Sequence, residues 1–226
     1  MTGSLLEVIA LDVRDAVAAE EGGADRLEVV ADMASDGLTP AAETVAAIAG
    51  RTALPQMVML RPAAGFTCDE ETLAGLVKSA AELKAAGAAG FVFGFLDADG
   101  AVDRAATEAL IHAVAPLPWS FHRAVDHAVD RKAAWRAVRL MPNLATVLTS
   151  GAPGGIGDGL GVLRGRAEAG DSALIMAGGG LKPVHVAPLL DYGVRAFHVG
   201  SAVRNSWSAP VEAGRVRRWR DLIDGR

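Results

Sequence analysis

The amino-acid sequence predicts a single (β/α)8 barrel over residues 1–226. Eight short apolar runs alternate with Ala-rich segments of helix length almost to the end of the chain. Successive runs begin about 21 to 34 residues apart, which suits one strand, one helix and their connections. The runs are apolar throughout, as is typical of parallel strands buried on both faces. Strands that alternate with helices imply a parallel sheet, and eight such units imply a closed barrel.

No Pro/Gly/Ser-rich linker or shift in composition divides the chain, so we expect one domain. The expected strands are LLEVIAL (5–11), RLEVV (26–30), QMVMLR (56–61), GFVFGF (90–95), WSFHRA (119–124), ATVLTS (145–150), ALIMAG (173–178) and AFHVGS (196–201). Helix patterns lie between them, for example at 12–23, 69–87 and 183–193. An open doubly wound sheet is the alternative, but the GxGxxG expected after its first strand is absent from LEVIALDVRD.

Capping residues mark the ends of the expected helices. Asp12, Asp69 and Asp130 stand at N-cap positions, where a carboxylate accepts hydrogen bonds from the first backbone N–H groups. Glycine is favoured just past a helix end because it adopts a left-handed backbone. The glycines at expected helix ends are Gly22, Gly50, Gly87, Gly170 and Gly193.

The composition argues against several classes of protein. The net charge is −5 and no basic run precedes RVRRWR (215–220), so we do not expect nucleic-acid binding and interpret that run as the solvated face of a last helix. The single cysteine, Cys68, excludes an internal disulfide framework and a multi-cysteine metal site. The chain has no 18-residue apolar run and no charged leader at its N-terminus, so we expect a cytoplasmic protein that does not enter a membrane.

Polar side chains gather where the expected strands end, which is the face on which barrels of this kind carry their chemistry. Candidates for acid–base chemistry are Glu7, Glu28, His122, Arg123 and His198. A buried carboxylate without a partner is costly, so Glu7 and Glu28 need partners. The nearest candidates as partners are Arg61, Arg123 and His122. The alternative is that these residues form internal ion pairs that hold the layers of the barrel in register.

A second set of residues predicts a binding site for a small anionic or phosphorylated ligand. Its members are Arg61, Asp126, Thr149, Ser150, Gly178, Gly179, Gly180, Gly200 and Ser201. The glycines belong to MAGGG and HVGSAV, which close the seventh and eighth expected strands. In many barrels the loops after these strands bind phosphate through backbone N–H groups, and glycine lets the backbone approach the anion. The alternative is that MAGGG only makes a tight turn.

Several other chemistries are not supported. None of the four lysines lies within an expected strand, which disfavours a Schiff-base aldolase, and neither a GxSxG elbow nor a P-loop is present. Cys68, in the loop GFTCDE, is interpreted as incidental. His112, His127 and His185 are interpreted as structural or surface residues. A metal site that combines His122, His198 and a glutamate stays open, because imidazole and carboxylate are suitable ligands.

Seven segments, in this order, resemble the copper homeostasis protein CutC family: LLEVIALDVRDAVAAEEGGADRLEVV, DGLTP, MLRPAAGF, FHRAVD, VLTSG, IMAGGG and FHVGSA. The resemblance runs nearly end to end. It implies a (β/α)8 barrel and a cytosolic protein linked to copper tolerance and copper binding. It also implies a homo-oligomer, such as a dimer or tetramer.

The chain departs from this family at the positions most relevant to copper. Many relatives have cysteines after LEV of the first strand and after LE of the second, where this chain has Ile9 and Val29 or Val30. Soft thiolates select copper, so the resemblance does not imply a cysteine copper site here and the cofactor is unknown. Strand eight carries GSA where ASA is common in relatives.

Three functions are therefore open. The resemblance implies copper homeostasis and copper binding. The residues themselves favour an enzyme with lyase, isomerase or hydrolase chemistry on a small anionic substrate. The third hypothesis is a scaffold whose pocket is vestigial.

Overall fold

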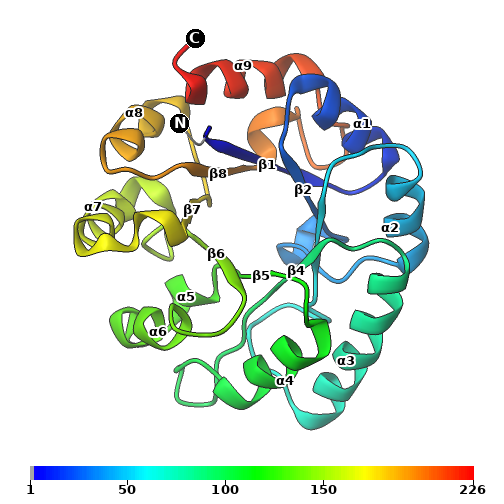
Figure 1. Cartoon of the computed structure of the whole chain (residues 1–226). Coiled ribbons are helices and arrows are strands. Elements are labelled where there is room, and N and C mark those ends of the chain that lie inside the picture. Colours follow the sequence, from blue (N-terminus) through cyan, green and yellow to red (C-terminus); the bar gives the residue numbers. More distant parts are fainter. Residues whose placement is uncertain (1–2) are drawn as a thin grey trace.

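The computed structural model describes residues 3–226, which form a closed barrel of eight parallel strands in chain order (Figure 1). The predicted (β/α)8 barrel is confirmed. The strands are β1 Leu5–Ala10, β2 Arg26–Val29, β3 Gln56–Met59, β4 Gly90–Phe93, β5 Trp119–Phe121, β6 Leu144–Thr149, β7 Ile175–Ala177 and β8 Ala196–Val199. Each lies within one residue of an expected apolar run or inside it.

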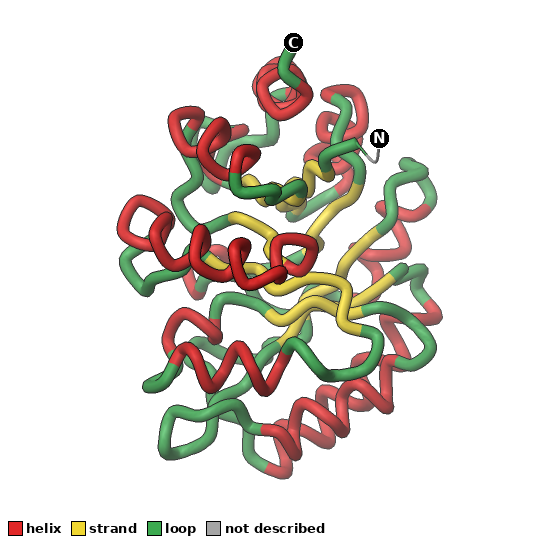
Figure 2. The backbone as a smooth tube through the Cα atoms, turned by 60° about the vertical axis from the view of Figure 1, so that its left-hand side comes forward, coloured by secondary structure: helices red, strands yellow, loops and turns green. Residues whose placement is uncertain are grey.

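Helices surround the strands on the outside, as the side view shows (Figure 2). They are α1 Val13–Gly22, α2 Ala42–Ala49, α3 Glu70–Ala85, α4 Arg104–Val114, α5 Ala124–His127, α6 Arg131–Val138, α7 Ile156–Arg166, α8 Pro183–Asp191 and α9 Ala213–Asp224. A short helical turn, η4, covers Ser201–Val203. None of the helices within residues 3–226 is both long and apolar enough to cross a membrane.

The three predicted N-caps are confirmed. The carboxylates of Asp12, Asp69 and Asp130 accept hydrogen bonds from backbone N–H groups at the starts of α1, α3 and α6. These bonds satisfy donors that have no partner inside the helix. The caps therefore fix where each of these helices begins.

Some of the glycines at helix ends differ from expectation. Helix α1 continues through Gly22, and Gly23 takes the left-handed conformation with φ of 87°. Gly50, which follows α2, has a right-handed backbone with φ of −76°. Gly87 and Gly193 do adopt positive φ just beyond α3 and α8. Close packing requires glycine at position 22, because a Cβ there would come within 2.4 Å of Val216 in α9.

The strands end earlier than the apolar runs suggest. Strand β3 ends at Met59 and β5 at Phe121, so Arg61 and His122 lie in the loops just after them. Just past the strands the backbone stays anchored to its neighbours: the His122 N–H donates to the Phe93 carbonyl at 3.2 Å, and the Arg61 carbonyl accepts from the Thr39 N–H at 2.8 Å. The polar residues thus stand on the rim of the barrel rather than in its wall.

The core has two parts. A large apolar cluster fills the space between the sheet and the helices. The inside of the barrel holds two smaller apolar clusters, one with Leu5 packed against it and one that contains Ile9. Glu7 lies between these two residues on β1 and is also buried. Because side chains alternate along a strand, all three point into the barrel, and a polar group is therefore enclosed within it.

Candidate functional site

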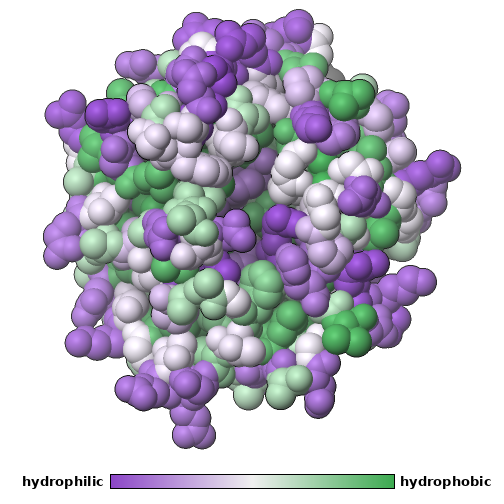
Figure 3. Space-filling view, turned by 180° about the vertical axis from the view of Figure 1, so that it is seen from behind, coloured by the Kyte–Doolittle hydropathy of each residue, from purple (hydrophilic) through white to green (hydrophobic). Residues whose placement is uncertain are grey.

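A cavity of about 240 Å³ opens at the carboxyl ends of the strands. Figure 3 shows this face of the molecule, which is hollowed at its centre, with hydrophilic side chains around the hollow. The structure brings nine of the candidate residues together in the lining: Glu28, Arg61, His122, Arg123, Gly179, Gly180, His198, Gly200 and Ser201. It places the other five outside the lining: Glu7, Asp126, Thr149, Ser150 and Gly178.

Glu7 lies inside the barrel with both carboxylate oxygens occupied. Its Oε2 accepts a hydrogen bond from Nε of Arg26 at 2.6 Å, and its Oε1 lies 2.8 Å from Nδ1 of His198. The strand register sets these contacts, because Glu7 on β1 is paired with Arg26 on β2 and with His198 on β8. Glu7 therefore holds His198 in place rather than contacting a ligand.

Glu28 lies two residues further along β2 than Arg26 and reaches the cavity. Its Oε2 lies 3.7 Å from Nε2 of His198, which is within ion-pair range but too long for a hydrogen bond. Within residues 3–226 its buried Oε1 has no hydrogen-bond partner. Burial raises the pKa of Glu28 to about 7, despite the opposing effect of His198. A carboxyl group that titrates near neutral pH can both accept and donate a proton there.

His198 links the two carboxyl groups. Because a carboxylate only accepts hydrogen bonds, Nδ1 of His198 carries the hydrogen that faces Glu7. Burial lowers the pKa of His198, but Glu28 and Glu7 outweigh that effect and raise it overall. Burial would raise the pKa of Glu7, but Arg26 and His198 hold it below its usual value. Glu7 therefore stays ionised, and Glu28 is the carboxyl group of this cluster that titrates near neutral pH.

The expected partners of the buried glutamates were wrong. We expected Arg61, Arg123 or His122, but Arg26 and His198 fill that role for Glu7. A signal for Arg26 was present in the sequence: it is two residues before Glu28 on one strand, and residues two apart point to the same side of a sheet.

His122 lines the cavity and carries an unpaired hydrogen-bond donor. The backbone N–H of Ala124 donates to its Nδ1 at 3.2 Å, so the ring hydrogen is on Nε2. Within the described part of the chain this buried Nε2 has no partner. Burial, helped by the charge of Arg61, lowers the pKa of His122 to about 3. The ring is therefore neutral at physiological pH and can donate to a ligand oxygen.

Arg123 lines the cavity and is oriented by Asp126. The carboxylate of Asp126 lies 3.4 Å from Nε of Arg123 and also accepts from the Thr149 hydroxyl at 2.6 Å and the Ser150 backbone N–H at 2.8 Å. Arg123 also donates to the Ser150 hydroxyl at 3.2 Å. Asp126, Thr149 and Ser150, which we had expected to bind a ligand directly, thus form a support for Arg123.

Arg61 and an aromatic cluster form another wall. Nε of Arg61 donates to the Gly65 carbonyl, and Nη1 donates to the carbonyls of Ser35 and Gly37. Phe66 lies 5.3 Å from this guanidinium. The ring of Phe66 also lies 5.0 Å from that of His127, so His127, which we had interpreted as structural or surface, is part of the cavity.

The MAGGG glycines differ in what they do. Gly179 and Gly180 have φ of 82° and 78°, which only glycine adopts readily. A Cβ on Gly178 would lie 2.6 Å from Leu148, and one on Gly179 would lie 2.7 Å from Nε of Arg123. A Cβ on Gly180 would meet nothing within 4 Å. Close packing therefore accounts for the first two glycines, while the backbone at Gly180 faces open space.

The HVGSAV segment lies beside MAGGG. A Cβ on Gly200 would come within 2.5 Å of the Trp207 ring, so glycine lets this tryptophan pack over the end of β8. Ser201 is exposed and begins η4. Within residues 3–226 the backbone N–H groups of Gly180 and Ser201 make no hydrogen bond to another group. They are free to bind an acceptor on a ligand.

Residues beyond the strand ends, in loops and in α5, complete the cavity, and strand patterns do not indicate them. Phe66, His127 and Trp207 each follow a strand by several residues and line the cavity. Their positions depend on how the loops pack. Met59 lies in an expected strand. It is buried and lines the cavity, and an apolar residue in an apolar run gives no sign of which side it faces.

Three residues offer a possible metal site. Ligand atoms of Glu7, Glu28 and His198 all lie within 4.8 Å of one another. The two oxygens of Glu7 are occupied, which leaves Glu28 and Nε2 of His198. Cys68 does not line the cavity, and burial raises its pKa to about 11. The residues therefore do not fit a thiolate Cu(I) site, whereas nitrogen and oxygen donors suit divalent cations.

The sequence model of the CutC family matches residues 4–203. The chain belongs to the CutC family. The family expected from the motifs is thus confirmed. Among CutC proteins, one from Klebsiella pneumoniae (strain ATCC 700721 / MGH 78578) is 33% identical over 196 residues, which cover 86% of this chain and 79% of the relative. One from Salmonella paratyphi B is 30% identical over 231 residues, covering 96% of this chain and 92% of the relative.

Solved structures support the fold. A candidate copper homeostasis protein CutC from Streptococcus agalactiae has a TM-score of 0.77 at 23% identity, covering 88% of this chain and 98% of that one. A phosphoribosyl anthranilate isomerase from Thermococcus kodakaraensis has a TM-score of 0.67 at 15% identity, covering 99% and 100%. At these identities the likeness shows the barrel alone.

Proposed function

We propose that this CutC family member is an enzyme that moves a proton on a small anionic substrate held in the cavity. One observation carries the proposal: Oε1 of Glu28 and Nε2 of His122 are both buried, both lack a partner within residues 3–226, and both residues line one cavity. Leaving a buried polar group unpaired costs about 1–3 kcal/mol. A ligand that pairs with both atoms would remove that cost.

The two groups differ in a way that suits proton transfer next to a carbonyl. Glu28 can accept a proton from the substrate carbon, and the electron pair of that C–H bond then moves onto the carbonyl oxygen. The Nε2–H of His122 can donate to that oxygen and stabilise the negative charge. The proton on Glu28 can return to a different carbon, as in an isomerase, or a neighbouring group can leave, as in a lyase.

Other residues have supporting roles in this scheme. Arg123 offers a fixed guanidinium to an anionic group, because Asp126 orients it. His198 lies 3.7 Å from Glu28, within ion-pair range, and its positive charge when protonated favours the ionised form of Glu28. Glu7 and Arg26 keep His198 in one orientation.

The test is a screen of small carboxylates, keto sugars and their phosphates, followed by deuterium exchange. Compounds that bind, as detected by ligand-observed NMR, are incubated with the protein in D2O and examined for deuterium next to a carbonyl. We expect exchange with the wild type and only background exchange with Glu28→Gln. The matched control is Glu70→Gln, which removes an exposed carboxylate and should leave exchange unchanged. Equal exchange in wild type and Glu28→Gln would contradict the proposal.

Metal binding linked to copper homeostasis is the second candidate, and the Glu7, Glu28 and His198 cluster favours it. Glu28 and Nε2 of His198 would hold a divalent cation such as Cu(II), with the thioethers of Met33 and Met59 in the same cavity. The CutC protein from Streptococcus agalactiae is described as a candidate copper homeostasis protein, and that description agrees with this candidate function.

Elemental analysis, and titration with Cu(II) of protein that has been freed of reductant, test this candidate. Tight one-to-one copper binding that His198→Ala abolishes would support it. The matched control is His112→Ala, on the exposed face of α4, which should bind copper as the wild type does. Absence of copper binding at micromolar concentration would contradict it.

A further inference from the structure

A second hollow adjoins the cavity. It is a groove of about 550 Å³ between α8 and α9, and its lining shares Gly180, Leu181, Ser201 and Ala202 with the cavity. The two hollows therefore meet at the ends of β7 and β8. These four residues line both hollows, so a group bound in the groove would lie next to the cavity.

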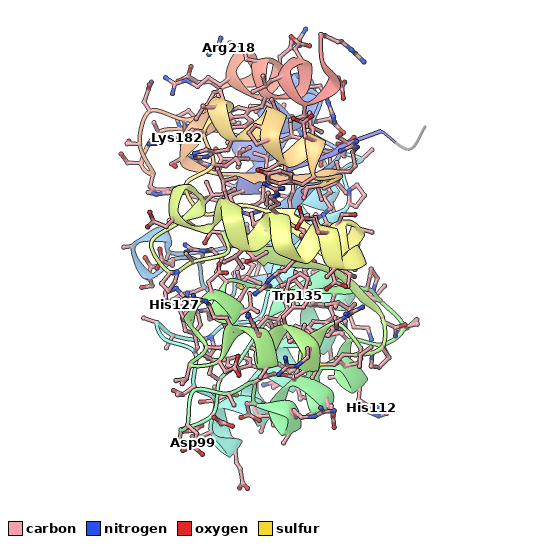
Figure 4. All side chains as sticks on the ribbon, turned by 90° about the vertical axis from the view of Figure 1, so that its left-hand side faces the viewer. Asp99, His112, His127, Trp135, Lys182 and Arg218 are labelled. Carbon is pink, nitrogen blue, oxygen red and sulfur yellow. The ribbon has the colours of Figure 1, made fainter. Side chains whose placement is uncertain are left out.

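The groove is strongly basic although the chain is acidic. The protein has 27 acidic residues against 22 basic ones, yet the groove lining contains Lys182, Arg215 and Arg218 and no carboxylate. Figure 4 shows Lys182 on the same side of the molecule as His127, which lines the cavity, and opposite His112. The positive groove thus opens on the face that carries the cavity.

Arg218 differs from the other arginines around it. Arg215 pairs with Glu212 at 3.0 Å, Arg220 pairs with Asp25 at 2.6 Å, and Arg217 donates to a backbone carbonyl. Within residues 3–226, Arg218 has no carboxylate within 4.0 Å, and neither does Lys182. Both side chains are exposed. We interpreted the RVRRWR segment from the sequence as a solvated face. It contributes one cation without a carboxylate partner, Arg218, to the lining of the groove.

Backbone donors stand where the groove meets the cavity. The N–H groups of Gly180 and Ser201 have no acceptor within the described residues. Gly180 has no neighbour within 4 Å of where a Cβ would be, so an anion can approach its backbone closely. Two free amides and two free cations thus line one groove, and together they match the several oxygens of a phosphate group.

We infer that the groove binds a phosphate group of the substrate, so that the substrate is a small phosphate ester with its reacting carbon in the cavity. This rests on the proposed function for the nature of the reacting end, but the phosphate site itself is independent of it. Lys182 and Arg218 supply the charge, and Gly180 and Ser201 supply directed N–H donors.

Calorimetric titration with inorganic phosphate at low salt tests the inference. We expect saturable binding of one phosphate, weakened about tenfold or more in the Lys182→Gln/Arg218→Gln double variant, because two charge-assisted contacts are lost. The matched control is Lys132→Gln/Arg136→Gln, which removes the same charge from exposed positions on α6. It should bind phosphate within twofold of wild type. Absence of phosphate binding, or equal binding by the two double variants, would overturn the inference.

Glu28→Gln separates the two proposals. It should bind inorganic phosphate as wild type does, because Glu28 is not part of the groove. Phosphate binding without any Glu28-dependent exchange would support the groove and contradict the proposed function. Glu28-dependent exchange on an unphosphorylated acid, without phosphate binding, would do the reverse. Comparison of sugar phosphates with the parent sugars should show tighter binding of the esters, and equal binding would count against the groove.

Discussion

Two buried carboxylates near the cavity have opposite surroundings. Asp126 is part of α5, outside the barrel wall, and accepts hydrogen bonds from Thr149, Ser150 and Gly151 at the end of β6. Glu28 lies inside the barrel, where its Oε1 has no partner within residues 3–226. Both side chains are almost fully buried. The first carboxylate is satisfied by the chain alone, whereas the second has an unpaired oxygen on a residue that lines the cavity.

This difference indicates that Asp126 has a structural role, whereas Glu28 is the candidate for a role in ligand binding or catalysis. A buried carboxylate with all its hydrogen bonds made stabilises the fold and holds its neighbours, as Asp126 holds Arg123. A buried carboxyl group that lacks a partner costs stability, and it is explained if a ligand completes it. Substitutions in the two regions should therefore have opposite patterns of effect on stability and on binding.

The largest effect on stability is expected from Asp126→Asn. The new amide group would place hydrogens against several donors, and the free energy of unfolding should fall by about 3–5 kcal/mol. Urea denaturation measures this. The control Asp97→Asn, in an exposed loop, should lose no more than about 1 kcal/mol. A loss of less than 1 kcal/mol from Asp126→Asn would mean that the Asp126 network is not the support described here.

Glu28→Gln should change how stability depends on pH. The folded-state pKa of Glu28 is raised from its ordinary 4.5 to about 7, so the folded protein holds this proton more tightly than the unfolded chain does. Stability from this group is present below pH 4.5 and is lost as pH rises toward 7, by about 3 kcal/mol in total. Urea denaturation at pH 5 and pH 8 should show this loss in the wild type and not in Glu28→Gln. Parallel pH profiles would refute the assignment.

Glu7→Gln should have an intermediate effect. It removes the charge that faces Arg26 and His198, and the free energy of unfolding should fall by about 2 kcal/mol. The pKa of His198 should also fall, because only Glu28 of the two carboxyl groups that raise it, Glu28 and Glu7, would remain. NMR titration of the His198 ring measures this. An unchanged His198 titration would show that Glu7 does not hold this ring.

Arg123→Gln should have the smallest effect on stability. Its side chain is 31% exposed and its contact with Asp126 is 3.4 Å, so we expect a change below about 1 kcal/mol. Binding of anionic ligands to the cavity should nevertheless weaken. A variant that binds such ligands as the wild type does would remove Arg123 from the site and leave it as part of the Asp126 support.

The fold was more predictable from the sequence than the site. Apolar runs identified the strands because buried parallel strands have no alternation to interrupt them. The alternation of side chains along a strand distinguishes the surroundings of Asp126 from those of Glu28. Leu148 lines the cavity, so its neighbour Thr149 points away from the cavity, toward Asp126. Phe66 and Trp207 could not be predicted, because their place depends on how long loops fold over the rim.

Titration of the Glu28 carboxyl carbon by 13C NMR tests the central claim most directly, namely that Glu28 is an unsatisfied acid–base group rather than part of a completed ion pair. With Glu28→Gln used to assign the signal, the account predicts a midpoint near pH 7 in the wild type. A midpoint near the ordinary 4.5 would contradict it, since Glu28 would then be a stable carboxylate paired with His198 and its oxygens would need no ligand.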